Sequence, residues 1–408
     1  MNRRTFLTVS AAAVGGAGFA QPPAKRKRIA AVNTVFFRMS HAYHIVGRLL
    51  HGYSVQGRHH TPPFTVPRMY TAQYPANDVS RAMAKKFNVG VTDSVAAALG
   101  GKGSLDVDGV LLIGEHGQYP RNALGQIQYP RYELFQEIVE VFKASGRSVP
   151  VFNDKHLSYD HAKAKEMVET ARRMGFAFMA GSSLPVTFRR PEWEPEYGAK
   201  IEEAVVCYYA DFDVYGFHAL EVLQSVMERR RGGETGVKSV RTLKGPAVWE
   251  AWDKGEWSKD LAEACLRKSS TRDFGRPRDH VENPSAMLVE YADGARATVL
   301  NMSGYVSDLT CAVKLAGDPK PQGALFYLPA PPGARFFDAL TYYIEELFAT
   351  GKSPYPVERT LLTSTVLDFA HRSAAEGGKM MTDPALGVTY MAPNRSFFFR
   401  GLPSDDNR

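Results

Sequence analysis

Short apolar runs alternate with amphipathic stretches over the first 185 residues. The clearest run lies at residues 107–114 (VDGVLLIG), and residues 28–37 and 148–153 have the same character. Apolar runs of this length between turn residues are typical of buried strands. Residues 132–145 and 159–174, which lie between or after such runs, have helical periodicity. Regular alternation of strand and helix predicts a parallel sheet with helices on both faces.

The other elements expected in this part rest on local signals. Ser40 can cap a helix, because its hydroxyl accepts a hydrogen bond from a backbone N–H of the first turn, and Asn77 or Asp78 can cap a second one. The expected elements are a helix at 41–50, a loop rich in His, Pro and Gly at 52–63, a strand near 67–73, helices at 79–87 and 94–99, and a strand at 176–181.

The second half of the chain has a different pattern. Residues 285–315 alternate apolar and polar side chains around a turn at Asp293 and Gly294. Such alternation indicates antiparallel strands. The other elements expected here are a strand at 201–211 and helices at 216–230, 335–350 and 358–375.

These patterns together predict an α/β fold of two domains. Residues 25–185 are expected to form a Rossmann-like, doubly wound parallel sheet. Residues 186–408 are expected to form a C-terminal α/β domain with a largely antiparallel open sheet. The length of 408 residues suits two domains of this size.

The first 24 residues have the pattern of an export signal. Arg3 and Arg4 stand before Phe6 and Leu7, and an apolar stretch of small residues continues to Ala20. This start looks like the twin-arginine type, and three glycines in the stretch argue against the alternative, an uncleaved membrane anchor. We therefore expect an exported or periplasmic protein with no stable membrane span after processing. Twin-arginine export moves folded proteins, which would suit a cofactor loaded beforehand.

Net charge and composition exclude several classes of protein. The formal net charge is +7, but six positive charges lie in the first 28 residues, which contain no acid. The rest of the chain is nearly neutral, so nothing indicates nucleic-acid binding. With 44% hydrophobic and 23% charged residues the chain is ordinary globular material. Its three cysteines cannot form a disulfide framework.

The chain contains three distinctive short segments, residues 149–156 (VPVFNDKH), 215–221 (YGFHALE) and 355–358 (YPVE). They resemble the Gfo/Idh/MocA family of glucose–fructose oxidoreductases and inositol dehydrogenases, and the resemblance covers most of residues 27–376. It implies an oxidoreductase that acts on a carbohydrate or polyol with NAD or NADP, and a possible homo-oligomer. It also implies that Lys155 lies beside the nicotinamide and the substrate.

The resemblance implies two further catalytic residues. His218 and Glu221 stand where the family's Gly-x-His-x-x-Asp pattern has its acid/base histidine and its substrate-binding acid. The family has another acid four places before the histidine, and that position is Val214 in this chain, one step from Asp213. The implied catalytic set is therefore Lys155, His218 and Glu221.

The expected dinucleotide site departs from the usual pattern. A glycine-rich turn after the first strand lets the backbone approach the pyrophosphate. Here residues 33–40 read NTVFFRMS, without a glycine, and residues 71–74 lack the acid that usually binds the ribose. We expect an atypically held nicotinamide cofactor. Its candidate contacts are Asn33, Arg38, Glu115 and Asp154.

Ionisable side chains follow two of the expected strands. Glu115 and His116 come after residues 107–114, and Asp154, Lys155 and His156 come after residues 148–153. Ligands of a parallel α/β sheet lie at the carboxyl ends of its strands. With Lys155 and His218 as proton acceptor and orienting group, a substrate hydroxyl could be oxidised. Alternatively, a divalent metal could serve a sugar lyase, epimerase or hydrolase. The candidate metal ligands are Glu115, His116, Asp154 and His156.

Two less specific readings remain open. The same scaffold could be a non-catalytic protein that binds a sugar or a partner. Lys155 could belong to a helix-capping loop and His218 to a packed helix face. His41 and His44 share a face of the expected helix at 41–50, where single histidines are usually structural.

Overall fold

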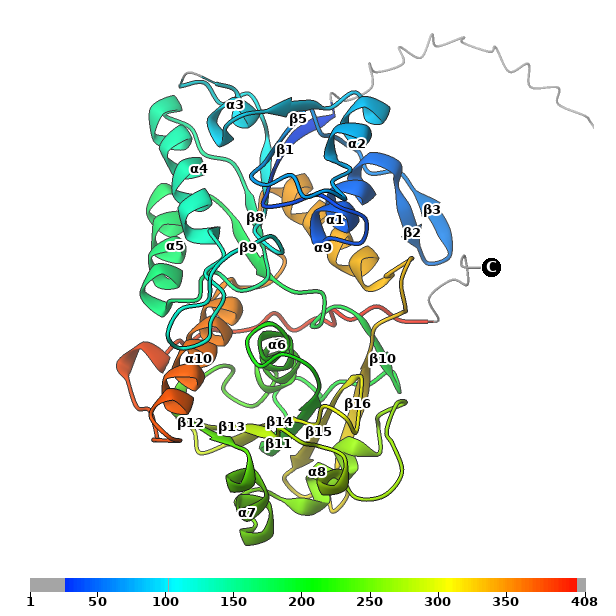
Figure 1. Ribbon diagram of the computed structural model, residues 1–408, viewed down its shortest axis with the longest axis vertical. Coiled ribbons are helices and arrows are strands. Elements are labelled where there is room, and N and C mark those ends of the chain that lie inside the picture. The colour runs from blue at the N-terminus through cyan, green and yellow to red at the C-terminus, as the bar shows by residue number, and fades with distance from the viewer. Residues whose placement is uncertain (1–25, 102, 402–408) are drawn as a thin grey trace, which may run out of the picture.

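The computed structural model describes residues 26–101 and 103–401, so the predicted export signal lies outside the described residues and stays a prediction. Two sheets, one above the other in Figure 1, organise this part of the chain. None of its helices combines the length and apolar character needed to cross a bilayer.

The first sheet is parallel and has the strand order β6-β5-β1-β7-β8-β9. The direction of the winding reverses between β1 and β7, and the crevice at such a reversal is the usual ligand position. A short strand, β4 (Phe64–Thr65), pairs with the start of β1. The bounds of the sheet strands are β1 (Lys27–Asn33), β5 (Arg68–Thr71), β6 (Gly90–Thr92), β7 (Gly109–Ile113), β8 (Val151–Asp154) and β9 (Phe178–Gly181).

Helices cover both faces of this sheet and bury its apolar runs, as predicted. One face is covered by α1 (His41–His51), α2 (Ser80–Phe87) and α9 (Phe336–Thr350). The other is covered by α3 (Val95–Leu99), α4 (Arg131–Ser145) and α5 (His161–Met174). Helix α9 comes from late in the chain yet packs on the first sheet. The division of the chain at residues 185 and 186 therefore stays a prediction.

The expected elements agree with the observed ones except in three places. Neither Asn77 nor Asp78 is the cap of α2, because this helix begins at Ser80 and its N-cap is Val79, without a side-chain hydrogen bond. Ser40 caps α1 as predicted, since its Oγ accepts from the Tyr43 N–H at 3.2 Å. The first strand was expected to continue to residue 37 but ends at Asn33, because the chain turns and Ser40 N donates to Phe37 O. Residues 52–63, expected to be a loop, contain a hairpin of β2 (Tyr53–Val55) and β3 (Arg58–His60).

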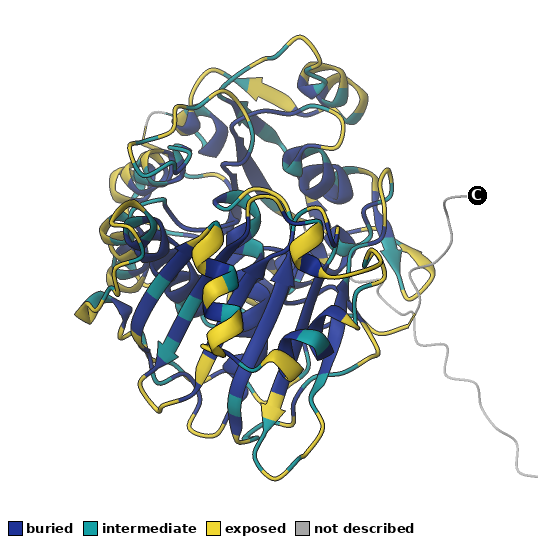
Figure 2. Cartoon of the chain, turned by 60° about the horizontal axis from the view of Figure 1, so that its bottom comes forward, coloured by how far each residue is buried: buried dark blue, intermediate teal, exposed yellow. Residues whose placement is uncertain are grey.

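The second sheet is largely antiparallel, as predicted, with the order β10-β16-β15-β11-β14-β13-β12. Strands β11 and β14 form its parallel pair. In Figure 2 its strands are mostly buried, while the helices over its outer side are exposed on their own outer surfaces. The bounds are β10 (Phe188–Arg190), β11 (Ile201–Tyr208), β12 (Val237–Lys244), β13 (Ser285–Tyr291), β14 (Arg296–Asn301), β15 (Leu309–Leu315) and β16 (Gln322–Tyr327).

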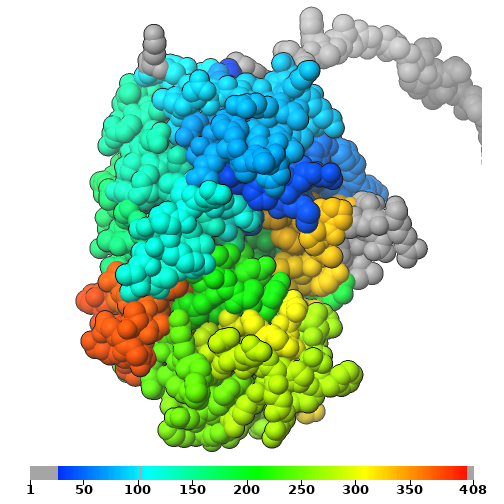
Figure 3. All heavy atoms as spheres, in the orientation of Figure 1, coloured from blue at the N-terminus to red at the C-terminus, as the bar shows by residue number. Residues whose placement is uncertain are grey.

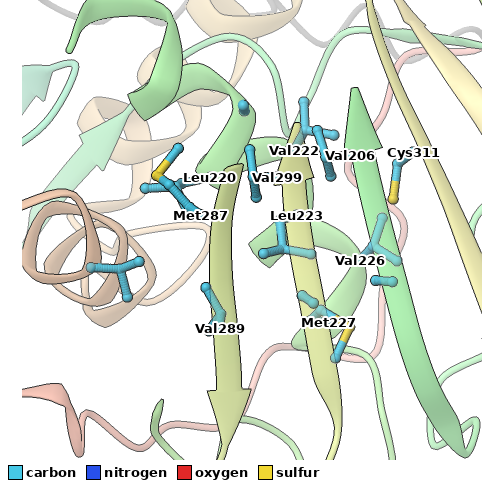
Figure 4. Packing of buried hydrophobic residues seen from close by; sticks show 14 of the residues in the cluster. Val206, Leu220, Val222, Leu223, Val226, Met227, Met287, Val289, Val299 and Cys311 are labelled. Atoms are coloured by element: carbon cyan, nitrogen blue, oxygen red, sulfur yellow. The ribbon is translucent and has the colours of Figure 1, made fainter. Parts of the chain in front are cut away.

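Apolar side chains of α6 (Val214–Met227) hold this sheet against the rest of the molecule. Leu220 and Leu223 of α6 lie among Val206 and Val299 of the sheet in a buried cluster (Figure 4). Helix α10 (Glu358–Ala375) joins the same cluster, and α7 (Pro246–Lys254) and α8 (Lys259–Leu266) cover the outer face. This packing fixes α6, and with it His218, beneath the carboxyl edge of the first sheet.

Candidate functional site

Lys155 and His218 meet between the two sheets. Lys155 follows β8, His218 lies in the second turn of α6, and Lys155 Nζ is 2.5 Å from His218 Nε2. An ammonium group can only donate hydrogen bonds, so His218 accepts through Nε2 and is neutral. Burial and the charge of Lys155 hold the pKa of His218 well below its usual range. The sequence prediction that these two residues share a site is consistent with this placement.

A buried ion pair supports the lysine from the other side. Glu115 Oε1 is 3.5 Å from Lys155 Nζ, and Glu115 Oε2 is paired with the guanidinium of Arg131. Burial alone would raise the pKa of Glu115, but the charges of Lys155 and Arg131 outweigh it and keep the pKa well below its ordinary value. Glu115 is therefore an ionised acceptor that lies between Lys155 and Arg131.

Sequence reasoning missed Arg131, the first residue of α4, which is 1% exposed. Its Nη1 donates to His156 Nε2 at 3.1 Å and its Nε donates to Asp154 O at 3.2 Å. One signal could have found it. A cation in the first turn of a helix opposes the helix dipole, so its presence there calls for a buried partner.

A second pair occupies the side of the site nearest α1. His41 Nδ1 is 2.7 Å from Asp154 Oδ2. The His41 ring lies edge-on to the rings of His116 and Phe337, with centroid distances of 5.2 and 5.0 Å. Burial and the charge of His41 lower the pKa of His116 to about 4, so His116 is neutral at physiological pH.

The backbone is strained at two of these strand ends. His116 has φ 66° and Lys155 has φ 70°, both in the left-handed region that glycine favours. Each such residue costs of order 1 kcal/mol or more, and the conformation persists only where surrounding contacts impose it. At Lys155 the N–H donates to Gly181 O at 3.1 Å, which holds the turn. Strain of this kind concentrates at functional sites.

Exposure divides the cluster into two sets of groups. His41, His116 and His218 are partly exposed residues, whereas Glu115 and Asp154 are buried. A ligand at this site would therefore contact the histidines, while the buried carboxylates would act on it through them.

Glu221, the third predicted catalytic residue, is not brought into this cluster. It is buried on α6, where Oε2 accepts from the Ser182 N–H at 3.0 Å and Oε1 accepts from Thr363 Oγ1 at 3.1 Å. A Cβ on Gly181 would lie 2.6 Å from Glu221 Oε2, so the carboxyl lies directly against the end of β9. Burial raises its pKa to about 7.

The raised pKa of Glu221 gives a test of its role. The folded state binds the proton more tightly than the unfolded chain, so stability should fall as pH rises from about 4.5 to about 7. We expect Glu221→Gln to remove up to about 3 kcal/mol of this loss between pH 5 and pH 8, measured by urea unfolding at both pH values. The exposed control Glu250→Gln should keep the wild-type slope. An unchanged slope in Glu221→Gln would show that this carboxyl is not the group that titrates.

The predicted metal ligands do not form a metal site. Glu115 and His156 both bind Arg131, and Asp154 binds His41. Among the described residues no group of three His, Cys, Asp or Glu side chains could hold a metal ion. The guanidinium of Arg131 supplies the positive charge that a cation would bring, which is the physical reason for the disagreement.

Only two of the four residues predicted to contact the cofactor lie in the ionisable cluster. Asn33 is buried, and its Nδ2 donates to Tyr70 O at 3.2 Å. Arg38 is exposed on the turn after β1. Phe36, from the same turn, is completely buried in the core beside α1. Only Glu115 and Asp154 of the predicted set belong to the ionisable cluster.

The crevice at the reversal of the sheet is closed by the chain itself. Thr34, directly after β1, donates from its N–H to Ile113 O at 3.1 Å and from Oγ1 to Glu115 O at 2.7 Å. Gln73, directly after β5, exchanges two hydrogen bonds with the backbone of Gln118, of 2.9 and 3.1 Å. A Cβ on Gly117 would lie 3.4 Å from Val35 Cγ1. These contacts join the loops after β1, β5 and β7 at the reversal of the sheet.

The segment that closes the crevice also reaches the second sheet. We call residues 115–130 the strap. In Figure 3 it spans the junction between the upper layer and α6. Its Ile127 N–H donates to Asp213 Oδ2 at 2.8 Å, and Asp213 Oδ1 is 3.1 Å from His371 Nε2. Asp213, the candidate substitute for the family's further acid, therefore fastens the strap.

Two sizeable cavities lie away from this cluster. One of about 390 Å³ lies between the β2–β3 hairpin and Phe398, and one of about 330 Å³ lies beside α1 and Gly333. Neither is lined by Lys155 or His218.

Comparison with known proteins supports the fold and adds no closer relationship. No family model and no curated protein matches the chain. Among solved structures, a myo-inositol 2-dehydrogenase from Lactobacillus plantarum has 13% identity and a TM-score of 0.54, over 88% of this chain and 99% of its own. GenD2 from gentamicin A biosynthesis, in complex with NAD, has 14% identity and a TM-score of 0.53, over 88% and 97%.

A third structure extends the same likeness. An oxidoreductase from Agrobacterium radiobacter, in complex with NAD+, L-tartaric acid and magnesium, has 11% identity and a TM-score of 0.53, over 88% of this chain and 98% of its own. These likenesses cover both sheets. The chain therefore has the two-domain, Rossmann-like fold of sugar and polyol dehydrogenases, as its resemblance to the Gfo/Idh/MocA family implies.

Proposed function

We propose that the protein is an enzyme acting on a carbohydrate or polyol, and that Lys155 and His218 together move the proton of a substrate hydroxyl group. The observation that carries this proposal is the 2.5 Å contact between Lys155 Nζ and His218 Nε2. A proton can pass between two nitrogen atoms in direct contact, and His218 Nδ1, which is buried without a hydrogen-bond partner, would connect the ammonium group with a ligand.

The surrounding charges suit this role. Glu115, Asp154, Arg131 and Lys155 contribute two negative and two positive charges, and His156 and His218 are neutral, since burial holds both pKa values well below the usual range. A site that is neutral overall binds an uncharged polyol without excluding it by charge. The ion pair between Glu115 and Arg131 fixes the position of the lysine before the substrate binds.

Oxidation of the hydroxyl is the first candidate reaction, because this fold is shared by a dehydrogenase named for inositol and by GenD2, whose structure contains NAD. It needs an acceptor for two electrons, for which NAD or NADP is the candidate. Since contacts between the loops close the crevice, such a cofactor would be held atypically. We therefore assign only the proton transfer of this reaction to residues of this chain.

A cofactor-free lyase or epimerase is the second candidate. The observation that favours it is the closed crevice, in which Gln73 and Gln118 exchange two hydrogen bonds across the end of β1. Such reactions move protons without a change in the substrate's overall oxidation state, so the ionisable cluster could serve them unaided.

Nicotinamide content separates the two candidates. We expect oxidoreduction to require one equivalent of NAD or NADP in protein purified without dialysis, measured by mass spectrometry after denaturation. A content below about one tenth of an equivalent, together with no binding of added NAD+ or NADP+ by calorimetry, would leave the cofactor-free reaction. Gln73→Ala is the matched variant. If the crevice opens in solution, loss of the Gln73–Gln118 contact should increase nucleotide binding by about tenfold, the equivalent of 1.4 kcal/mol.

A further inference from the structure

His41 has the geometry of an oriented proton acceptor. Asp154 is 0% exposed, and its carboxylate can only accept hydrogen bonds when it is ionised. The 2.7 Å contact therefore places a proton on His41 Nδ1. In the neutral ring this leaves the lone pair on Nε2, the atom that does not face Asp154. A buried carboxylate that fixes one nitrogen of a histidine in this way makes the other nitrogen a general base.

The ring of His41 is held in place and is accessible. His116 and Phe337 contact it edge-on from two directions, and its side chain remains 16% exposed. His41 contacts Asp154 and His218 contacts Lys155, so both rings lie in the region at the end of β8.

The two proton-carrying pairs approach this space from opposite layers. Asp154 and Lys155 are consecutive residues at the end of β8. Asp154 binds His41 of α1 in the first layer, whereas Lys155 binds His218 of α6 in the second. A ligand between the layers would have an imidazole base on one side and the lysine and histidine pair on the other.

We infer that His41 is a second catalytic acid/base, positioned by Asp154, and that the substrate lies between it and the pair of Lys155 and His218. This inference rests on the second candidate of the proposed function, the cofactor-free lyase or epimerase, and selects a reaction in which one proton is removed and another is delivered. The substrate class is a sugar or sugar acid that carries a carbonyl group, because a carbonyl acidifies the neighbouring C–H.

The proton balance of such a reaction is complete without an oxidant. The substrate C–H bond breaks, its proton goes to His41 Nε2, and the electron pair remains as an enolate delocalised onto the neighbouring carbonyl. A new C–H bond forms on the opposite face with a proton from Lys155 delivered through His218, which inverts the carbon. Lys155 is reprotonated from water and His41 releases its proton to water, so both groups return to their starting states.

Two variants test the role of His41 against a merely structural one. His41→Asn keeps an N–H for Asp154 but removes Nε2, and Asp154→Asn keeps the volume but no longer fixes the tautomer. The exposed residue His51 at the end of α1 supplies the control His51→Asn. The probes are myo-inositol, D-glucose, D-glucuronate and 2-keto-D-gluconate, each incubated with the full chain in D2O. The readouts are solvent deuterium incorporation by NMR and turnover.

We expect the wild type to incorporate deuterium into an acidic or keto probe. His41→Asn should lower the kcat of this reaction about 100-fold or more and leave KM nearly unchanged. Asp154→Asn should lower it similarly and shift the pH profile, and His51→Asn should match the wild type. Diethyl pyrocarbonate should label His41 about tenfold faster in the wild type than in Asp154→Asn, because only the fixed tautomer keeps the Nε2 lone pair available.

The possible failures are distinguishable. If Lys155→Met abolishes turnover while His41→Asn retains it, the inference about His41 is wrong and the proposed function stands. If no probe is turned over, or Lys155→Met has no effect, the proposed function fails. In that case the diethyl pyrocarbonate labelling alone tests the role of His41. Equal labelling of His41 in the wild type and in Asp154→Asn would overturn its assignment as a base.

Discussion

Replacement of Lys155 by methionine is expected to lower turnover of a carbohydrate or polyol substrate by about 100- to 10,000-fold, the range for loss of a positioned proton-transfer group. Methionine nearly preserves the length of the side chain, and Glu115 keeps Arg131 as a partner. The fold should therefore survive and KM should change little. The measurement is steady-state kinetics, with circular dichroism melting to show that the variant is folded.

The matched control for this variant is Lys165→Met, an exposed lysine of α5 with a long surface contact to Glu169 of 3.7 Å. It should behave as the wild type. If Lys155→Met retained more than about a tenth of the wild-type kcat, the lysine would not carry the proton. Its contact with His218 would then be structural.

Replacement of Arg131 by methionine should be the most destabilising single change at the site. It leaves the Glu115 carboxylate with Lys155 as its remaining cationic partner at 3.5 Å, and it removes the hydrogen bonds to His156 and to Asp154 O. Breaking a buried ion pair by removing one partner costs about 3–5 kcal/mol. Urea unfolding at pH 7 would measure this loss of stability.

A double variant separates charge from packing. Arg131→Met with Glu115→Met removes both charges and should recover much of the lost stability, because a buried pair replaced by apolar residues is often near neutral. It should not recover activity, since Lys155 loses its carboxylate acceptor. The exposed control Arg276→Met should leave stability unchanged. Equal stability of Arg131→Met and wild type would contradict the role given to the ion pair.

The sequence predicted the framework of the site well because the framework depends on local periodicity. Apolar runs marked β7 and β8, and the carboxyl ends of neighbouring parallel strands must lie together, so Glu115 and Lys155 were expected at one edge. The approach of His218 followed from the resemblance of residues 215–221 to a family pattern. That resemblance also implied a role beside them for Glu221, which the fold instead buries against Gly181.

Contacts set by tertiary packing could not be predicted in the same way. His41 and Asp154 are 113 positions apart, and no periodicity states that the start of α1 lies over the end of β8. Arg131 stands immediately before the helix expected at residues 132–145. Its burial could not be predicted, because amphipathic patterns do not show which polar side chain turns inward. The position of α9 on the first sheet likewise depends on how a late segment returns across the molecule.

Contacts between the loops that follow the strands could not be predicted from the sequence either. The absence of glycine in residues 33–40 indicated an unusual nucleotide site, but it did not reveal the contact between Gln73 and Gln118. That contact joins two loops through one side chain and a backbone, which no sequence pattern specifies.

The most direct test of the central claim is a crystal structure of the full chain soaked with the carbohydrate probe that it turns over or binds most tightly. The account predicts a sugar between the two layers, with a hydroxyl oxygen within hydrogen-bond distance of Lys155 Nζ or of the His218 ring. A sugar bound instead in the cavity of about 390 Å³ beside the β2–β3 hairpin, with the pair of Lys155 and His218 untouched, would contradict it.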